Sequence, residues 1–444
     1  MIRQFSRSAL ALLSMAAVTA CASASDQIPG APQKKPIVIK NGVLHIVSGP
    51  NVRAGAVVIK EGKITEIGEN VTIPPNAEVI DAKGSHVYPS LIDAQSNIGL
   101  VEIDSIRATI DSSETGSINP NVRAAAAFNP DSELIPVARA NGVLLAVSAP
   151  EGGLISGRSA LMMLDGWTWE DMTLKADIGM QLNWPRGFAG FGEGREGRGN
   201  REGGPGAGGG GNDLKALEEL FTTVQRYAAG VEQDTVRFDS RLKALIPVLK
   251  GELPLTVSAN SASQIRSAVA FAKKWKLKIR IYGGYDAMDC SELLIQEKIP
   301  VIVGGVYRVP SRRDQPYDDA YTLPGRLQKA GVKFCISSAG RFGATGLRNL
   351  PYNAATAAGF GLEPDEALRA ITLSPAEILG VADRVGSLEP GKDATLFLAD
   401  GDILETQTQV TAAFVQGRVV DLSNKHTQLY KKYSEKQQQL KESR

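Results

Sequence analysis

Histidine is scarce in this sequence, with only His45, His86 and His426 among 444 residues. His45 falls in an N-terminal strand pattern, His86 comes just before the large central region, and His426 opens a polar tail. We interpret all three as surface or edge residues rather than as metal ligands, which converge on one point. No arrangement of serine, cysteine and histidine indicates nucleophilic catalysis either.

An excess of charge of one sign is also missing. The chain has 49 Lys and Arg against 48 Asp and Glu, a formal net charge of +1. This balance provides no positive field for a phosphate backbone, so nucleic acid is not an expected partner. Cysteine is equally rare, with three residues. Two of them, Cys290 and Cys335, lie in the predicted folded body and are expected to be buried free thiols.

Residues 1–24 have the pattern of a targeting segment. Arg3 and Arg7 form a basic start, and the apolar stretch 9–20 is too short to span a bilayer as a stable helix. The pattern predicts export.

Two ways of processing this segment are open. Val18-Thr19-Ala20-Cys21 resembles a bacterial lipobox, which makes Cys21 a lipidation candidate. The alternative is ordinary cleavage after Ala24, with Cys21 lost with the signal. The expected location is the periplasm, or the outer membrane for a lipoprotein. Association with the membrane is expected only through a lipid anchor on Cys21.

The remaining sequence divides into three parts. Short apolar runs separated by turn signals occupy residues 36–84 and again 385–422. Between them, residues 85–384 alternate strand and helix patterns, as a (β/α)8 barrel requires. The predicted strands include 143–147, 255–258, 279–282, 301–303 and 332–336, and the predicted helices include 214–227, 262–275 and 364–372.

Two segments depart from this barrel plan. The insertion 187–211 is dominated by glycine and buries too little apolar surface to offset its ordering entropy, so it is expected to be a flexible excursion. It is either a tolerated surface insertion or a lid or docking loop near the barrel mouth. Residues 425–444 predict a polar, solvated terminal helix.

The segment that leads into the central region carries the most information. It reads Pro89-Ser90-Leu91-Ile92-Asp93-Ala94-Gln95-Ser96-Asn97. It resembles the first barrel strand of the amidohydrolase superfamily, which reads approximately Pro-Gly-Leu-Ile-Asp-x-His-x-His. Residues 54–64, 374–380 and 385–396 also resemble that family, and particularly its imidazolonepropionase-like members in an exported bacterial branch. The resemblance spans most of the mature chain.

The resemblance implies an α/β fold with a TIM-type barrel over 85–384. Residues 36–84 and 385–422 would pair into one composite β-sandwich. It also implies hydrolysis of non-peptide carbon–nitrogen bonds, with one or two divalent metals at the barrel mouth that generate hydroxide from bound water.

The metal-ligand positions are substituted in this sequence. Gln95 and Asn97 stand where the family has its two histidines, and Ser258, Gly283 and Ala339 stand at or near the later histidine and aspartate positions. Amides and hydroxyls are poor zinc ligands, and glycine and alanine offer no side-chain donor. We therefore predict that the metal centre is lost and expect no cofactor, whereas an active enzyme would need zinc or another divalent metal.

Polar residues remain in the predicted mouth. They would either hold a small ligand or plug the mouth by bonding to one another. Arg341 and Arg348 follow a strand and could receive an anionic group. Asp93 is expected to point to the opposite strand face and to support the fold. The candidate pocket residues are Gln95, Asn97, Ser258, Asn260, Gly283, Ala339, Arg341 and Arg348.

These observations leave three hypotheses. The leading one is a degenerate hydrolase that acts as a binding subunit for a small-molecule ligand, or as the partner of an active amidohydrolase relative. The second is an active amidohydrolase with a rebuilt site, acting on a cyclic amide or a small amide compound. The third is a purely structural envelope protein, which predicts a sealed barrel.

Overall fold

A computed structural model describes residues 27–185, 210–338 and 343–442. The targeting segment with Cys21, nearly all of the glycine-rich insertion, Ala339 and Arg341 lie outside the described residues. Within the described ranges, no helix has both the length and the apolar composition needed to cross a bilayer.

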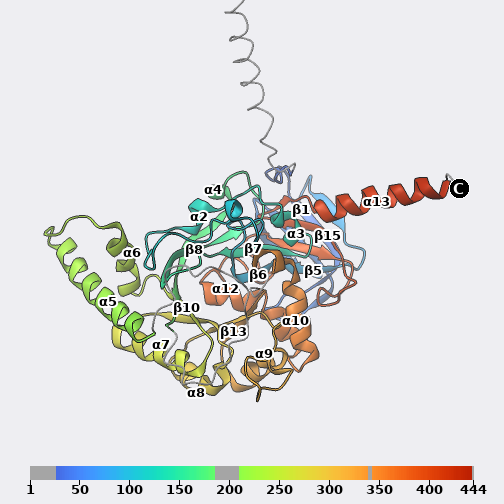
Figure 1. Ribbon diagram of the computed structural model, residues 1–444. Helices are drawn as coiled ribbons and strands as arrows, with labels where there is room; N and C mark the ends of the chain where they lie inside the picture. Colours follow the sequence, from blue (N-terminus) through green and yellow to red (C-terminus); the bar gives the residue numbers. More distant parts are fainter. Residues whose placement is uncertain (1–26, 186–209, 339–342, 443–444) are drawn as a thin grey trace, which may run out of the picture.

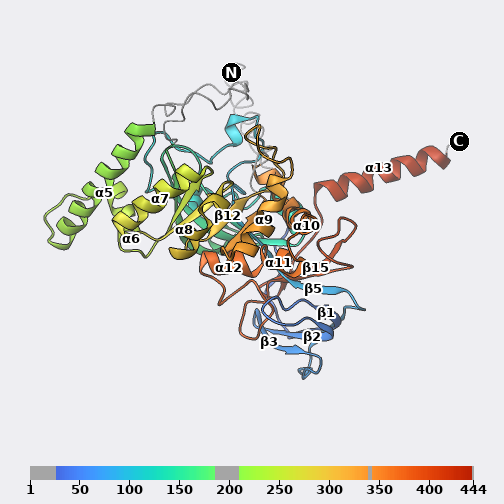
Figure 2. The ribbon, with the colours of Figure 1, turned by 90° about the horizontal axis from the view of Figure 1, so that it is seen from below.

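The two ends of the chain build one β-sheet domain, as the resemblance implies. Its eight strands follow the order β16-β15-β14-β5-β1-β2-β3, with β4 also paired to β1, so C-terminal β14 lies beside N-terminal β5. Figure 2 shows the blue strands β1–β3 next to the red β15, apart from the barrel. The strands are β1 Ile37–Leu44, β2 Val52–Lys60, β3 Lys63–Gly68, β4 Glu78–Asp81, β5 His86–Pro89, β14 Leu396–Ala399, β15 Val410–Val415 and β16 Arg418–Val419.

This domain is hydrogen-bonded as a single sheet rather than as two stacked sheets. Strand β1 pairs with β4 through Ile37–Lys40 and then with β5 through Val43 and Leu44. The change of partner falls at Asn41, which has a left-handed φ of 59°. Asparagine tolerates that conformation better than most residues, so the chain can bend there. The domain has its own core, including Ile39, Val57 and Phe414.

The central region forms a second eight-stranded sheet that curls into a barrel (Figure 1). Its order follows the sequence from β6 to β13. Strand β8 is antiparallel to both β7 and β9, whereas all other neighbours are parallel. The fold is therefore a TIM-type barrel with one reversed strand, and not a regular (β/α)8 repeat. The strands are β6 Leu91–Ser96, β7 Val143–Ser148, β8 Ile155–Met163, β9 Thr173–Asn183, β10 Leu255–Ala259, β11 Ile279–Gly283, β12 Val301–Gly304 and β13 Phe334–Ser337.

Helices cover the barrel from outside. Helix α7 covers Ala262–Trp275, the predicted bounds, because Ser261 and Gln264 form a capping box at its start and Lys276 ends it with a left-handed φ. The others are α2 Ala124–Ala127, α3 Leu134–Arg139, α4 Trp169–Met172, α5 Gly210–Glu232, α6 Ser240–Leu249, α8 Ser291–Gln296, α9 Asp319–Ala330, α10 Leu350–Gly359, α11 Pro364–Arg369 and α12 Leu373–Leu379, with 3-10 turns at Arg107–Thr109, Ala287–Cys290 and Gly343–Asn349. Cys290 and Cys335 are buried and free.

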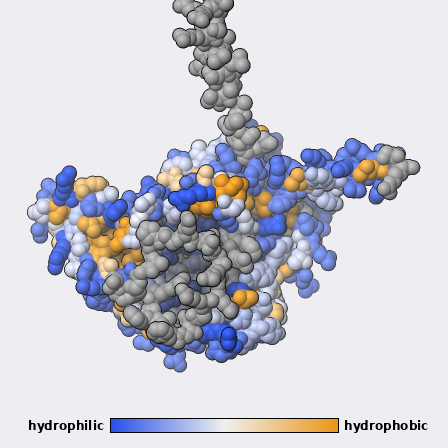
Figure 3. All heavy atoms as spheres, viewed as in Figure 1, coloured by the Kyte–Doolittle hydropathy of each residue, from blue (hydrophilic) through white to orange (hydrophobic). Residues whose placement is uncertain are grey.

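Helix α13, Lys425–Glu442, projects away from the body in both ribbon views (Figures 1 and 2) and has no buried residue. In Figure 3 most of its visible atoms have the colour of hydrophilic residues.

The barrel is closed between its last and first strands by side chains. Within the described residues, no backbone ladder joins β13 to β6. The amides of Ile92 and Ile336 donate instead to the carbonyls of Ile371 and Ala370, at 2.8 and 2.9 Å. Asp93 of β6 spans the remaining gap, since its carboxylate accepts hydrogen bonds from Ser337 at the end of β13 and from the residue after it.

Two of the three histidines lie together in the sheet domain. His45 Nε2 is 2.9 Å from His86 Nδ1, and the same nitrogen of His86 is 3.1 Å from the hydroxyl of Tyr88. The ring of His45 stacks on Tyr88 with 4.1 Å between centroids. Burial, reinforced by His86, lowers the pKa of His45 to about 4. The pair is a structural element of the sheet domain, because His86 begins β5 and lies outside the barrel strands.

We predict that this pair makes stability depend on pH. The unfolded chain binds a proton at His45 near pH 6.5, whereas the folded chain resists it until about pH 4. The free energy of unfolding therefore falls as pH drops from 6.5 towards 4, by roughly 2 kcal/mol after allowance for the solvent-exposed part of the ring. Urea unfolding of the wild type and of His45→Gln at each pH measures it.

The matched control is His426→Gln, which changes an exposed histidine on α13. We expect the free energy of unfolding of this variant to fall with decreasing pH as steeply as that of the wild type. In His45→Gln it should fall less steeply. Equal slopes in all three proteins would contradict the prediction.

Candidate functional site

One cavity lies at the carboxyl ends of the parallel barrel strands, where enzymes of this architecture place their sites. Its volume is about 220 Å³. The carboxyl ends of β6, β9, β10 and β11, the first residues of β8 and the loop after β7 all contribute to it, because reversal of β8 brings its amino end to this mouth. The lining residues are Gln95, Ser96, Asn97, Pro150, Glu151, Ser156, Gln181, Asn183, Ser258, Tyr282 and Gly343.

The structure brings together three of the predicted pocket residues, Gln95, Asn97 and Ser258. Asn260 is exposed and stands outside the lining. Arg348 is also exposed, and only its carbonyl is engaged, by Asn141 Nδ2 at 2.9 Å. The structure therefore does not place Arg348 in this cavity, and its predicted role in receiving an anionic group stays a prediction. It lies in the 3-10 turn before α10, which carries its side chain to the surface.

Strand β11 presents Tyr282 to the cavity and not Gly283. Tyr282 pairs with Ser258 in the barrel ladder, so the two occupy the same level of the interior. Gly283 has a φ of 88°, and a Cβ there would lie 2.0 Å from Asn260 Oδ1. Glycine is thus required at this position by backbone conformation and by the neighbouring amide. This explains why no ligand side chain can stand there.

A directed chain of hydrogen bonds fixes the orientation of Gln95. Ser159 Oγ donates to the carbonyl of Gly179 at 3.1 Å, so it accepts from Gln181 Nε2 at 3.0 Å. Gln181 Oε1 then accepts from Gln95 Nε2 at 3.2 Å. A carbonyl can only accept, so the direction of the whole chain is determined. Its last atom, Gln95 Oε1, is buried and has no hydrogen-bond partner among the residues that the structure describes.

A second acceptor lies beside it. Asn97 Nδ2 donates to Glu151 Oε1 at 3.4 Å, a carboxylate on the loop after β7. Asn97 Oδ1 is buried, and no described residue bonds to it. The side chains of Gln95 and Asn97 belong to residues only 8% and 6% exposed, so bulk water does not solvate these two oxygens freely. Unsatisfied buried acceptors are rare, and each one requires an explanation.

Asp93 corrects one expectation from the sequence. It faces the barrel interior, on the same side of β6 as Gln95, because residues two apart on a strand share a face. It is fully buried, and it accepts from Ser337 Oγ at 2.7 Å, Ser338 N at 2.9 Å and Gln95 N at 3.0 Å, and also from Ser338 Oγ. Burial raises the pKa of Asp93. Its acceptor capacity is used in closing the barrel, so its role is structural.

A buried cation fills the barrel below the cavity. Arg280, 3% exposed, donates from Nε to Thr256 Oγ1 at 2.8 Å and from Nη2 to the carbonyl of Ile178 at 3.1 Å. A Cβ at Gly179 would lie 2.3 Å from this guanidinium, so glycine provides the room. Burial lowers the pKa of Arg280 to about 10. The barrel interior is thus packed with bonded polar groups up to the level of Gln181.

Sequence reasoning missed Glu151, Gln181, Asn183 and Tyr282. Tyr282 and Asn183 could have been found, because they pair with Ser258 in the parallel ladders and follow from strand register. Glu151 and Gln181 carry no motif. Burial raises the pKa of Tyr282, so its hydroxyl stays protonated.

These side chains do not fit a catalytic zinc. Zinc sites use imidazole, thiolate or carboxylate, with three or four protein ligands. The described residues that line the cavity offer amides and hydroxyls, with Glu151 as their one carboxylate. Across ranges 27–185, 210–338 and 343–442, no three His, Cys, Asp or Glu side chains come close enough together to hold a metal ion.

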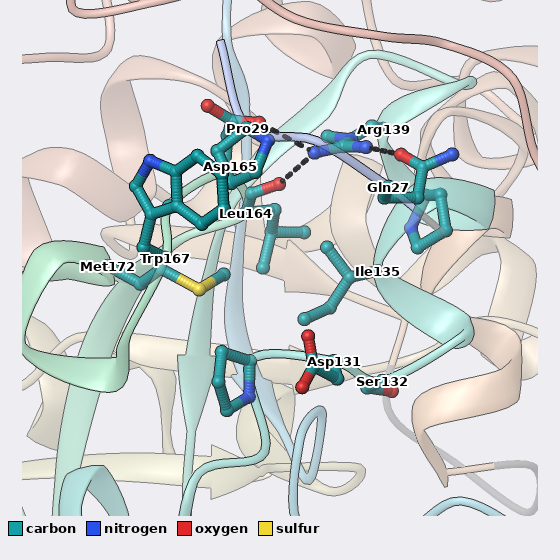
Figure 4. A pocket seen from close by; sticks show the side chains of 13 residues that line it. Gln27, Pro29, Asp131, Ser132, Ile135, Arg139, Leu164, Asp165, Trp167 and Met172 are labelled. Carbon is teal, nitrogen blue, oxygen red and sulfur yellow. Dashed lines mark hydrogen bonds and ion pairs between the residues drawn. The ribbon is translucent and has the colours of Figure 1, made fainter. Parts of the chain in front are cut away.

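A larger cavity, about 290 Å³, lies at the opposite end of the barrel strands (Figure 4). Its principal charged group is already engaged: Arg139 Nη1 donates to Asp165 Oδ1 at 2.8 Å and to the carbonyl of Leu164 at 3.1 Å. Arg139 Nη2 also bonds to Gln27. Trp167 and Met172 form an apolar wall. The arrangement fastens the N-terminal segment to the barrel, and it lies away from the end where barrel proteins carry function.

Comparison with known proteins agrees with this architecture. Residues 259–421 match the amidohydrolase family. The chain is 24% identical over 380 residues to imidazolonepropionase of Mesorhizobium japonicum, covering 79% of this chain and 87% of that protein. A shorter stretch of 67 residues is 43% identical to 5'-deoxyadenosine deaminase of Methanosarcina acetivorans, over 14% of this chain and 15% of that one.

The structure resembles that of an amidohydrolase from Thermotoga maritima MSB8, with a TM-score of 0.77 and 25% identity, over 87% of this chain and 99% of that one. Family match, related sequence and similar structure all agree with the two-part fold. The chain belongs to the amidohydrolase superfamily, a superfamily of hydrolases.

Proposed function

We propose that this protein is an exported member of the superfamily that binds a small molecule at its barrel mouth without a catalytic metal. It acts as a binding subunit or as the partner of an active relative. The observation that carries the proposal is the chemistry of the cavity: among its described lining residues, Glu151 is the one carboxylate beside amides and hydroxyls. Such a set can recognise a ligand by hydrogen bonds, but it lacks the ligands that would lower the pKa of a bound water.

The position of Asp93 supports the same proposal. A carboxylate near the end of the first strand would be the natural general base for hydrolysis. Here its oxygens accept from Ser337, Ser338 and the amide of Gln95. A base already committed to closing the barrel cannot accept a proton from water without breaking those bonds. The cavity is nevertheless open to a ligand, which distinguishes the proposal from a purely structural envelope protein.

We predict that the purified protein holds far less than one zinc per chain after dialysis against zinc. The reason is that, in the part of the chain that the structure describes, no set of imidazole, thiolate or carboxylate groups converges on one point. Elemental analysis measures it, with a metal-dependent member of the family purified in parallel as the control. About one zinc per chain, lost with amide-hydrolysing activity on chelation, would establish instead the active enzyme with a rebuilt site.

Export is the second part of the proposal and rests on the targeting pattern of residues 1–24. The intact mass of the mature protein from membrane and soluble fractions tests it. A mature chain that begins at a lipid-modified Cys21 identifies a lipoprotein, one that begins at Ser25 identifies ordinary cleavage, and a chain that retains Met1 argues against export.

A further inference from the structure

We propose that the ligand of the mouth cavity is a compact nitrogen compound that donates N–H groups, either a neutral amide or a small alkylammonium ion, and not a carboxylate. This inference rests on the proposed function, because it assumes that the cavity binds and does not hold a metal. It follows from the two buried acceptors that the protein leaves without partners, Gln95 Oε1 and Asn97 Oδ1.

The direction of these two amides is set by their surroundings. Gln95 must donate towards Gln181, because the chain of bonds ends on the carbonyl of Gly179. Asn97 must donate towards Glu151, because a carboxylate only accepts. Rotating either amide by 180° would place an oxygen against another acceptor. Both side chains therefore present oxygen, and not nitrogen, to the cavity.

The two oxygens themselves select the kind of ligand. A carboxylate ligand would bring only further acceptor atoms against these two carbonyl oxygens, whereas an N–H donor would satisfy both. A buried acceptor without a hydrogen bond destabilises the free protein, so a ligand that donates to both oxygens binds more tightly than one that cannot.

Size restricts the class further. A volume of about 220 Å³ is smaller than the pockets that hold drug-sized molecules. The hydroxyls of Ser258 and Tyr282, the latter kept protonated by burial, can bond to a carbonyl on the same ligand. A short primary amide presents both an N–H₂ group and a carbonyl, and it matches the cavity better than a hydrocarbon or an acid.

Propionamide, propylammonium and propionate test the inference because they have nearly the same shape and differ in donors and charge. Binding to the full mature protein is followed by saturation-transfer NMR titration up to 50 mM. We expect propionamide or propylammonium to bind at least tenfold more tightly than propionate. Equal binding of propionate, tighter binding of propionate, or no binding of any probe would overturn the inference.

Two variants assign the binding to the cavity. Gln95→Leu and Asn97→Leu each remove one acceptor, and each should weaken binding of the preferred probe by about tenfold. Gln438→Leu, an identical change on exposed helix α13, should leave affinity unchanged. If Gln95→Leu fails to fold, the selectivity of the wild type among the three probes still decides. The zinc measurement is made on the same sample, so a metal-bearing protein refutes the proposed function, whereas a metal-free protein that prefers propionate refutes only this inference.

Discussion

Replacing Asp93 by alanine is expected to lower the free energy of unfolding by about 3–5 kcal/mol, among the largest effects available from one side chain. The carboxylate is fully buried and accepts from Ser337, Ser338 and the amide of Gln95. Alanine would take the acceptor away from the backbone amides of Gln95 and Ser338, whereas Ser337 Oγ would keep the carbonyl of Gln95 at 2.8 Å. The loss falls at the junction of β6 and β13, which has no backbone ladder within the described residues. Urea unfolding monitored by far-UV circular dichroism measures the change.

Two further variants distinguish the loss of the contacts between β6 and β13 from a general effect of removing a carboxylate. Asp93→Asn keeps one acceptor oxygen but faces Ser338 with a second donor, so its loss should be intermediate. Asp104→Ala removes an exposed aspartate and should change stability by less than about 0.5 kcal/mol. Loss of less than about 1 kcal/mol in Asp93→Ala would show that the barrel closes by other contacts.

The same residue shows where sequence reasoning succeeded and where it failed. The match around residues 89–97 identified the first barrel strand and the neutral residues at its end. Yet Asp93 was assigned to the wrong face, although Asp93, Gln95 and Asn97 are spaced by two and must share one. The alternation in the sequence contained this information. The partners of Asp93 did not follow from it, since Ser337 and Ser338 lie more than 240 residues away.

The regular parts of the barrel were predictable because their signals are local. Helix α7 has a capping box and an apolar stripe, and strands β10 to β12 are short β-branched runs. Strand β8 was not predicted, and its reversal follows from tertiary pairing with β7 and β9 rather than from any residue in Ile155–Met163. That reversal places Ser156 at the mouth, beside Glu151 in the loop that follows parallel strand β7. The cavity therefore contains groups that no family pattern indicates.

Replacing Asp165 by alanine is expected to cost about 3–5 kcal/mol as well, for a different physical reason. Asp165 and Arg139 are 1% and 5% exposed, and they form an ion pair of 2.8 Å. Burial raises the pKa of Asp165 and lowers that of Arg139, as expected for two charges held away from water. Removing one partner would leave the guanidinium buried without its counter-charge, and that uncompensated charge dominates the loss.

The same carboxylate also fastens three parts of the fold. Asp165 Oδ2 accepts from the amide of Gly30 at 3.1 Å and is 3.8 Å from Arg418 Nη2 of β16. The N-terminal segment, the sheet domain and the barrel therefore meet at this residue. Figure 4 shows its ion pair with Arg139. We therefore expect Asp165→Ala to increase proteolysis near residue 30 in addition to lowering the unfolding midpoint.

Glu297→Ala is the matched control, because it breaks a close but solvent-accessible pair with Lys273, of 2.6 Å, and should cost less than about 1 kcal/mol. The double variant Arg139→Met with Asp165→Leu discriminates between the two sources of the loss. It removes both charges and restores apolar volume, so it should be more stable than Asp165→Ala if the buried charge is the cause. If the double variant is as unstable as Asp165→Ala, the loss of unfolding free energy comes from the contacts to Gly30 and Arg418 instead.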